Sequence, residues 1–285
     1  MKTTYKHFVI TRFNLPAFPK DKNGKETLTD SWMEERFTLF EKYCIPSIVN
    51  QTVTNFEWLV LFDIKTINQF KKKIDFYSNS IAFFTPVYIE DLTKISSYIK
   101  SKLTDEDDWL ITTRIDNDDS IHKDFVSDIQ ILFKSHLKDC FFRYNYGYQW
   151  NTQTQCLLKF YEQYGNHFLS RIENIKRGVE TVFSCENTNI DFLKNVEVVD
   201  IDDKKQRLWI EVVHNTNVAN HSRVLLPVFC KKKLEPFYVD VVINKKESLK
   251  MIYRFLKTQM YNLGAALFEK IGLFNFYKSC IKWFK

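Results

Sequence analysis

Glycine is scarce in this chain, with six residues among 285. Glycine-rich loops let a backbone approach a phosphate group closely, and neither GxGxxG nor GxxxxGKS/T occurs in the sequence. This scarcity argues against a glycine-based phosphate loop of the dinucleotide-binding or P-loop type.

Paired cysteines and long apolar runs are lacking as well. The six cysteines are widely scattered without any CxxC spacing, which is typical of reduced thiols and not of a disulfide framework or a zinc site. No apolar run approaches the ~20 residues that cross a bilayer, and the N-terminal MKTTYKHFVITRF is too polar for a signal peptide. We therefore expect a cytoplasmic protein, either free or peripheral on the inner face of a bacterial membrane.

The charge balance is mildly basic, with a formal net charge of +6. This charge suits an anionic small substrate, an acidic membrane surface or nucleic acid, or simply a solvated basic surface, and does not choose among them. The length suits one large α/β domain with a small appendage. We place a main domain over residues 1–225 and a basic, amphipathic helical extension over residues 226–285.

Strand-like and helix-like segments alternate through the first half of the chain. This alternation predicts an α/β fold whose mostly parallel central sheet carries helices on both faces. Ligands of such sheets bind beyond the carboxyl ends of the strands, where Arg12, Asp63 and Asp116 would gather. The predicted strands cover residues 7–11, 57–62, 81–89 and 108–113, and the predicted helices begin at residues 31, 67, 92 and 122.

An acidic cluster follows the predicted strand 108–113, in the stretch TTRIDNDDSIHKDF. Carboxylates this close raise each other's pKa unless a cation neutralises them, and oxygen ligands on a short turn suit Mg²⁺ or Mn²⁺. Helix capping by Asp118, Asp119 or Ser120 is the alternative, and it accounts for one carboxylate but not for three. We predict that Asp116 and Asp118 bind a divalent cation and that Asp119 and Ser120 begin the next helix.

A histidine and two arginines complete the predicted site. His214 follows the apolar strand 208–213 and is a candidate third metal ligand, the alternative being an ordinary hydrogen-bonded histidine. Arg12 and Arg114 suit phosphate, although each is also placed to pair with the acidic cluster. The predicted donor-binding set is Thr11, Arg12, Asp63, Arg114 and Asp116, and Asp63 has helix capping as its alternative role.

Four segments together resemble a known family. RFTLFEKYCIPSIVNQTVTNFEWLVLFD and the later DNDD resemble the GT-A glycosyltransferases of the large inverting family 2 type. With ITRFN and VVHNTNVANH, the chain resembles more closely the bacterial "putative rhamnosyltransferase" family, over about residues 5 to 225. Two departures stand out: the wider superfamily usually has Asp-Asp-Gly where this chain has Phe62-Asp63-Ile64, and no glycine follows His214.

The resemblance implies a GT-A-like fold and roles for particular residues. Asp63 would lie near the nucleotide base, Asp116 near the ribose or metal, and Asp118 on the metal that binds the diphosphate, with His214 as a further contact. The implied activity is metal-dependent, inverting transfer of a sugar from a nucleotide-diphosphate sugar to a glycan or lipid-linked acceptor in bacterial surface polysaccharide synthesis. Nucleic acid is not an expected partner.

The resemblance leaves the general base open, with Glu180, Glu186 and Glu211 as candidates. Two other classes of function also remain open: a metal-dependent phosphotransferase or nuclease that uses the same carboxylates, and a non-catalytic carbohydrate-binding protein.

The segment 250–285 combines apolar residues with an excess of lysine in a helical pattern. Such a helix can lie on an anionic membrane surface. The alternative is a helix packed on the domain with a solvated lysine face.

Overall fold

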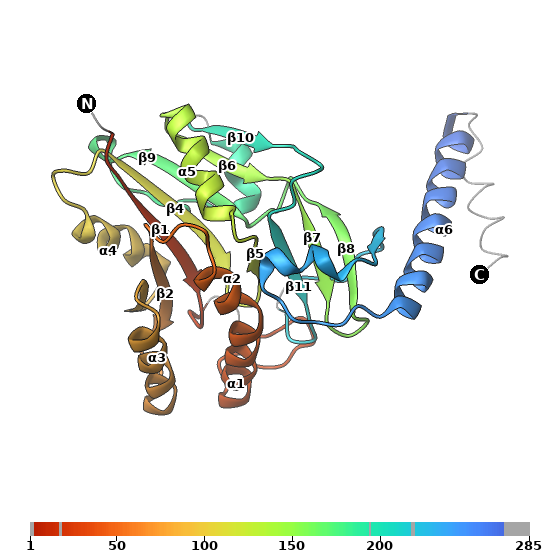
Figure 1. Ribbon diagram of the computed structural model, residues 1–285, viewed down its shortest axis with the longest axis horizontal. Helices are drawn as coiled ribbons and strands as arrows, with labels where there is room; N and C mark the ends of the chain where they lie inside the picture. The colour runs from red at the N-terminus through yellow and green to blue at the C-terminus, as the bar shows by residue number, and fades with distance from the viewer. Residues whose placement is uncertain (1–2, 17–18, 194, 218–219, 271–285) are drawn as a thin grey trace.

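The computed structural model describes residues 3–16, 19–193, 195–217 and 220–270, and its largest element is a seven-stranded sheet (Figure 1). The strand order is β10-β6-β9-β4-β1-β2-β3, and β9 is antiparallel to both of its neighbours whereas the other pairs are parallel. The predicted α/β class with a mostly parallel sheet is therefore confirmed. The strands are β1 (Tyr5–Arg12), β2 (Glu57–Asp63), β3 (Phe84–Ile89), β4 (Trp109–Asp116), β6 (Cys140–Tyr144), β9 (Leu169–Asn174) and β10 (Glu197–Ile201).

Helices cover both faces of this sheet. Successive side chains of a strand point to opposite sides, so each strand packs against the helices on both faces. Val9 of β1 packs in one core cluster with residues of α1, α3 and α5, whereas its neighbours Phe8 and Ile10 pack in another with α4. The helices are α1 (Asp30–Leu39), α2 (Ile45–Val49), α3 (Asn68–Ser80), α4 (Ile95–Lys102), α5 (Phe125–His136) and α6 (Lys245–Lys270), with a π-helical turn over Phe40–Cys44 joining α1 to α2.

A second, five-stranded sheet lies beside the first, in the order β12-β8-β7-β11-β5. Trp209 of β11 belongs to the same core cluster as the main sheet, so the two sheets share one core. Gly147 of β7 permits this packing, since a Cβ there would lie 2.1 Å from the Trp209 ring. The strands are β5 (Ser120–Ile121), β7 (Tyr146–Asn151), β8 (Cys156–Tyr161), β11 (Trp209–Val213) and β12 (Pro227–Val228).

The segment after residue 225 divides into two parts. β12 pairs with β8, and Phe237, Val239 and Val241 are buried in a cluster with Trp150, so this stretch is part of the body. α6 then leaves the body and stands apart from it in Figure 1. No helix within the described ranges combines the length and apolar character needed to cross a membrane.

Candidate functional site

β4 extends to Asp116, whereas the sequence predicted that the strand ends at residue 113. The acidic turn therefore follows the strand directly. The parallel register sets Arg12 of β1 beside Asp116. Arg114 Nη2 lies 3.2 Å from Asp116 Oδ2, and Arg12 Nη2 lies 3.6 Å from Asp116 Oδ1. Burial raises the pKa of Asp116, but the charges of Arg114 and Arg12 outweigh it and hold that pKa well below its usual range. Asp116 is therefore an ionised, partly exposed carboxylate between two guanidinium groups.

A shared aromatic ring holds these two arginines. The guanidinium carbons of Arg12 and Arg114 lie 5.8 Å and 5.7 Å from the centroid of the Phe183 ring. Guanidinium groups stack on aromatic faces and retain donors for phosphate. Both arginines pair with the acidic cluster, as predicted. This pairing does not exclude the predicted phosphate-binding role at the same place.

Asp118 lies on the other side of the turn, buried between α1 and the end of β11. Its Oδ2 accepts hydrogen bonds from Arg36 Nη1 at 2.6 Å and shares one with His214 Nε2 at 2.8 Å. Burial raises the pKa of Asp118, but Arg36 and His214 lower it further than burial raises it. Arg36 also donates to the Thr216 carbonyl, so Asp118 fastens α1 to the segment after β11.

Asp119 is fully buried and does not begin a helix, which corrects the prediction from the sequence. Its Oδ1 accepts the Val212 backbone N–H at 2.8 Å, and its Oδ2 lies 2.6 Å from His167 Nε2. Ser120 enters strand β5, because residues 120 and 121 pair with β11, and α5 starts only at Phe125. The turn therefore carries the chain from the main sheet into the second sheet.

His167 precedes β9, and the sequence analysis missed it. Burial lowers the pKa of His167, but the hydrogen bond to Asp119 and the charges of Asp116 and Asp119 outweigh it and raise the pKa to about 9. The chain separates His167 from Asp119 by 48 residues, so no local motif joins them.

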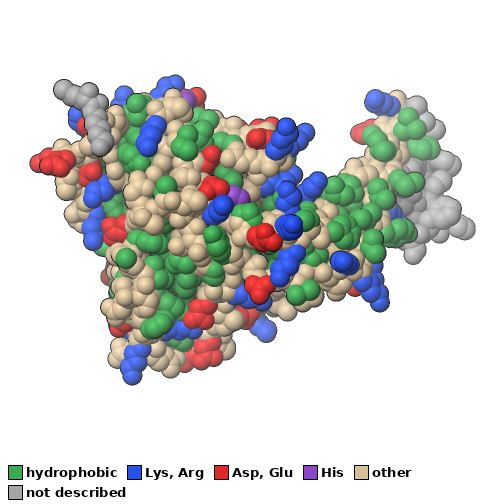
Figure 2. Space-filling view, viewed as in Figure 1, with side chains coloured by type: hydrophobic (Ala, Val, Ile, Leu, Met, Phe, Trp, Pro, Cys, Tyr) green, Lys and Arg blue, Asp and Glu red, His purple; other side chains and the backbone are tan. Residues whose placement is uncertain are grey.

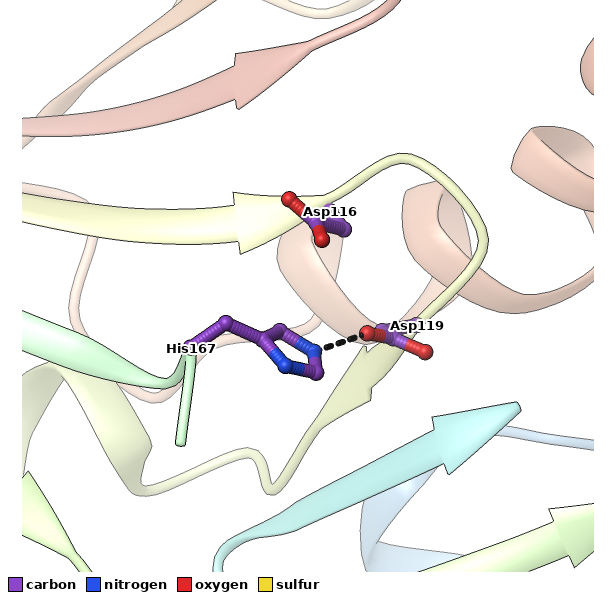
Figure 3. Close-up of side chains that lie close together, drawn as sticks. All are labelled: Asp116, Asp119 and His167. Atoms are coloured by element: carbon purple, nitrogen blue, oxygen red, sulfur yellow. Dashed lines mark hydrogen bonds and ion pairs between the residues drawn. The ribbon is translucent and has the colours of Figure 1, made fainter. Parts of the chain in front are cut away.

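Asp116, Asp119 and His167 each offer a ligand atom, and these atoms all lie within 4.8 Å of one another (Figure 3). Two carboxylates and an imidazole form a donor set that could hold a divalent metal ion. Asp116 is partly exposed, so the cluster is in contact with solvent through this residue. Of the three metal ligands predicted from the sequence, Asp116 is in this cluster, whereas Asp118 contacts both His214 and Arg36.

The remaining predicted donor-binding residues have different environments. Asp63 lies at the carboxyl end of β2, where its Oδ1 accepts the Lys65 backbone N–H at 2.7 Å, so it caps the following turn. Thr11 is fully buried, and its hydroxyl accepts a hydrogen bond from Trp58 Nε1 at 3.0 Å. Thr11 therefore supports the packing of β1 on β2 instead of facing a ligand.

The three candidate bases occupy three environments. Glu180 is exposed and pairs with Arg171 at 2.5 Å. Glu211 of β11 is buried and accepts a hydrogen bond from Gln149 Nε2 at 2.6 Å, and burial raises its pKa against the charge of His167. Glu186 is exposed, and its charge acts on Arg12, whose pKa is lowered by burial and partly restored by Asp116 and Glu186.

Comparison with solved structures gives weak likenesses. S. aureus TarS residues 1–349 in complex with UDP-GlcNAc has a TM-score of 0.44 and 12% identity, over 88% of this chain and 71% of that one. Another TarS 1–349 structure has a TM-score of 0.41 and 13% identity over 73% of this chain, which spans 60% of that chain's length. A "putative nucleotide-diphospho-sugar transferase" from Desulfovibrio desulfuricans G20 has a TM-score of 0.39 and 9% identity, over 76% and 84% of the two chains. Likenesses of this strength carry no argument about function.

The comparison with curated proteins finds no match. The family model described as "Putative rhamnosyl transferase" matches residues 6–225, which include the main sheet, the acidic turn, His167 and His214. The chain therefore belongs to this family of glycosyl transferases.

Proposed function

We propose that this protein is a metal-dependent glycosyltransferase that moves a sugar from a nucleotide-diphosphate sugar to a hydroxyl of a glycan or lipid-linked saccharide. The observation that carries the proposal is the meeting of Arg12 and Arg114 with the Asp116, Asp119 and His167 cluster at the carboxyl ends of β1 and β4. Cationic donors beside an oxygen-rich metal cluster match the charge of a diphosphate.

The donor would lie along this edge of the sheet. Arg12 and Arg114 would donate hydrogen bonds to the diphosphate, whose negative charge grows as the bond to the sugar breaks. Asp63, at the end of β2, would accept hydrogen bonds from the nucleoside.

Asp116, Asp119 and His167 would hold Mn²⁺ or Mg²⁺. When bound, the cation supplies electrostatic stabilisation of the leaving diphosphate. Asp118 and His214, the ligands proposed from the sequence, instead support the turn, because Asp118 binds both His214 and Arg36. Their role is to keep the neighbouring aspartates in place.

The general base that we propose is Glu186. A base must reach the acceptor hydroxyl, so it must be accessible from solvent and close to the diphosphate site. Glu186 is exposed and within electrostatic range of Arg12, whereas Glu211 is buried against Gln149 and Glu180 is paired with Arg171. Attack by the acceptor opposite the leaving diphosphate would invert the anomeric carbon.

The setting that we propose is bacterial surface polysaccharide synthesis at the cytoplasmic face of the membrane, where lipid-linked acceptors are exposed. The family description supports rhamnose as the first sugar to test.

The decisive experiment measures release of free nucleoside diphosphate from a panel of nucleotide sugars, including activated rhamnose and UDP-GlcNAc, with Mn²⁺ and with a chelator. We expect metal-dependent release with one donor, faster when an acceptor is present, and loss of release in Asp116→Asn. Glu186→Gln should lose turnover while donor binding persists, with Glu180→Gln as the matched control. Cleavage of a phosphodiester substrate instead would indicate a nuclease or phosphotransferase, and donor binding without turnover would indicate a non-catalytic binding protein.

A further inference from the structure

Among the residues that the structure describes, α6 is buried against the body near its start. Ser248 and Met251 are its buried residues, and Met251 packs with Cys156 and Leu158 of β8, the strand next to the edge strand β12 of the second sheet. Beyond Met251 the described part of the helix carries no buried side chain, and Figure 1 shows it projecting from the molecule. The large apolar side chains that are exposed on this helix are therefore not covered by the body.

One face of α6 is continuously apolar. Its large side chains recur at alternating spacings of four and three residues, which places them on one side of an α-helix. They are 54–73% exposed, although residues of this type are ordinarily buried. These residues, which we call the apolar face, are Leu249, Tyr253, Leu256, Met260, Leu263 and Leu267.

A basic flank runs beside the apolar face. At about 100° per residue, Lys246, Lys250, Arg254 and Lys257 fall together on one side of it. Glu247 and Glu269 are the only acidic residues of the helix, against six lysines and arginines. Figure 2 shows hydrophobic side chains along the visible face of α6 and Lys and Arg side chains where the helix meets the body.

The occupant of this face has to satisfy both features. A second copy of α6 would match the leucine spacing, but it would offer no acidic side chain to Lys250 and Lys257, which flank the apolar face at the positions where coiled-coil partners exchange charges. An anionic bilayer offers apolar chains to the leucines and phosphate or carboxylate headgroups to the lysines. The charge pattern therefore favours a lipid surface over self-association.

We propose that α6 is a membrane-docking helix, whose apolar face enters the headgroup boundary of an anionic bilayer while its basic flank binds the headgroups. The proposal takes only its biological setting from the proposed function. Binding is measured without donor or acceptor, so a failure to bind lipid and a failure to transfer sugar are separate results.

The test uses the full-length protein in co-sedimentation with vesicles of phosphatidylcholine containing phosphatidylserine, and with pure phosphatidylcholine. Leu256→Gln/Leu263→Gln should weaken binding to the anionic vesicles by about tenfold or more, because two leucines no longer leave water. Thr258→Gln/Asn262→Gln is the matched control, since it places the same residues on the opposite, exposed side of the helix without a change of charge. Circular dichroism establishes that each variant is folded.

The basic flank has its own test. Lys250→Gln/Lys257→Gln should lose most of the preference for anionic over neutral vesicles and most of the salt dependence of binding. Failure of the wild-type protein to bind anionic vesicles would overturn the proposal. Equal binding by Leu256→Gln/Leu263→Gln and by its control Thr258→Gln/Asn262→Gln would overturn it as well. Concentration-dependent dimerisation in sedimentation velocity that is lost in Leu256→Gln/Leu263→Gln, without vesicle binding, would overturn it in favour of a second copy.

Discussion

At the scale of single residues, each aspartate of the turn after β4 has a cationic partner within the protein. Asp116 has Arg12 and Arg114, Asp118 has Arg36, and Asp119 has His167. Reasoning from the sequence treated these carboxylates as charges that a metal must neutralise. The fold supplies each carboxylate with a partner, although burial and the charges of Asp118 and Asp116 still raise the pKa of Asp119 to about 8 against its hydrogen bond to His167.

This pairing separates the roles of two neighbouring aspartates. Asp118→Asn leaves the buried Arg36 guanidinium without its carboxylate and should lower the free energy of unfolding by about 3 kcal/mol. Mn²⁺ binding should persist in this variant and be lost in Asp119→Asn, the adjacent control. Urea unfolding and Mn²⁺ titration by calorimetry measure the two effects. Loss of Mn²⁺ binding in Asp118→Asn at unchanged stability would restore the ligand set predicted from the sequence.

Gly147 is a second residue whose identity has a specific structural reason. An alanine Cβ there would lie 2.1–2.3 Å from three atoms of the buried Trp209 ring, so a side chain at the junction of the two sheets must shift. We expect Gly147→Ala to lower the free energy of unfolding by about 3 kcal/mol. Gly24→Ala meets no neighbour but has a φ of +79°, so its cost should be about 1 kcal/mol. Equal unfolding midpoints in urea for the two variants would contradict the close packing of β7 on Trp209.

At the scale of elements, a buried arginine links β6 to β10 and to the short helix before it. Arg143 Nε lies 2.7 Å from Asp200 Oδ1, and Arg143 Nη1 lies 2.7 Å from Asp191 Oδ2. Burial raises the pKa of Asp200, but hydrogen bonds from Arg143 and Asn145 lower it more, so the folded pKa lies below the ordinary value. The resulting stability is present above the unfolded pKa and is lost as the pH falls through the folded pKa.

Asp200→Asn should therefore destabilise the protein at pH 7 by about 1–2 kcal/mol. The difference from the wild type should shrink as the pH falls below about 4, where the wild-type carboxyl also begins to take up a proton. Urea unfolding at pH 7 and pH 3 measures this. A gap between the two proteins that is the same at both pH values would show that the charge of Asp200 contributes nothing.

The elements that the sequence predicts well are those with plain apolar patterns. β1, β2 and β4 are apolar runs buried on both faces, and α3 and α4 follow regular helical spacing. β9 lacks a plain apolar pattern because Arg171 and Glu173 are part of it, and the structure buries both side chains and pairs them at 3.2 Å. When charged residues of a buried strand neutralise each other by pairing, the sequence does not show the apolar pattern from which a strand is predicted.

Prediction of the candidate site from the sequence has the same limit. Asp116, Arg12 and Arg114 could be placed from strand ends alone, because parallel strands bring their carboxyl ends to one edge. Asp119 and His167 could not, since their contact depends on the chain crossing from the main sheet to the second sheet at β5. The aromatic stretch 141–150 gives no sign of this crossing, and the structure divides it at Asn145 into β6 of the main sheet and β7 of the second sheet.

At the scale of the whole molecule, lipid docking by α6 should affect sugar transfer to a membrane-anchored acceptor but not to a soluble one. Leu256→Gln/Leu263→Gln should lower kcat/KM for an acceptor anchored in anionic vesicles and leave kcat/KM for the same saccharide in solution unchanged. The physical reason is the higher effective concentration of enzyme and acceptor held on one surface. Equal losses with the two acceptors would show that the substitutions damage the catalytic domain instead.

If α6 docks on lipid as proposed, the second sheet would set the distance between the membrane surface and the candidate site. β5 and β11 border the acidic turn, whereas β8 and β12 hold the start of α6, so site and docking helix lie at opposite edges of one sheet. Strands are spaced about 4.8 Å apart, which gives about 19 Å across the four steps from β5 to β12. With α6 in the lipid, an acceptor hydroxyl must stand at a comparable height above the headgroups to be reached. The enzyme would then select acceptors by length, passing over sugars close to the lipid and extending chains long enough to span the sheet.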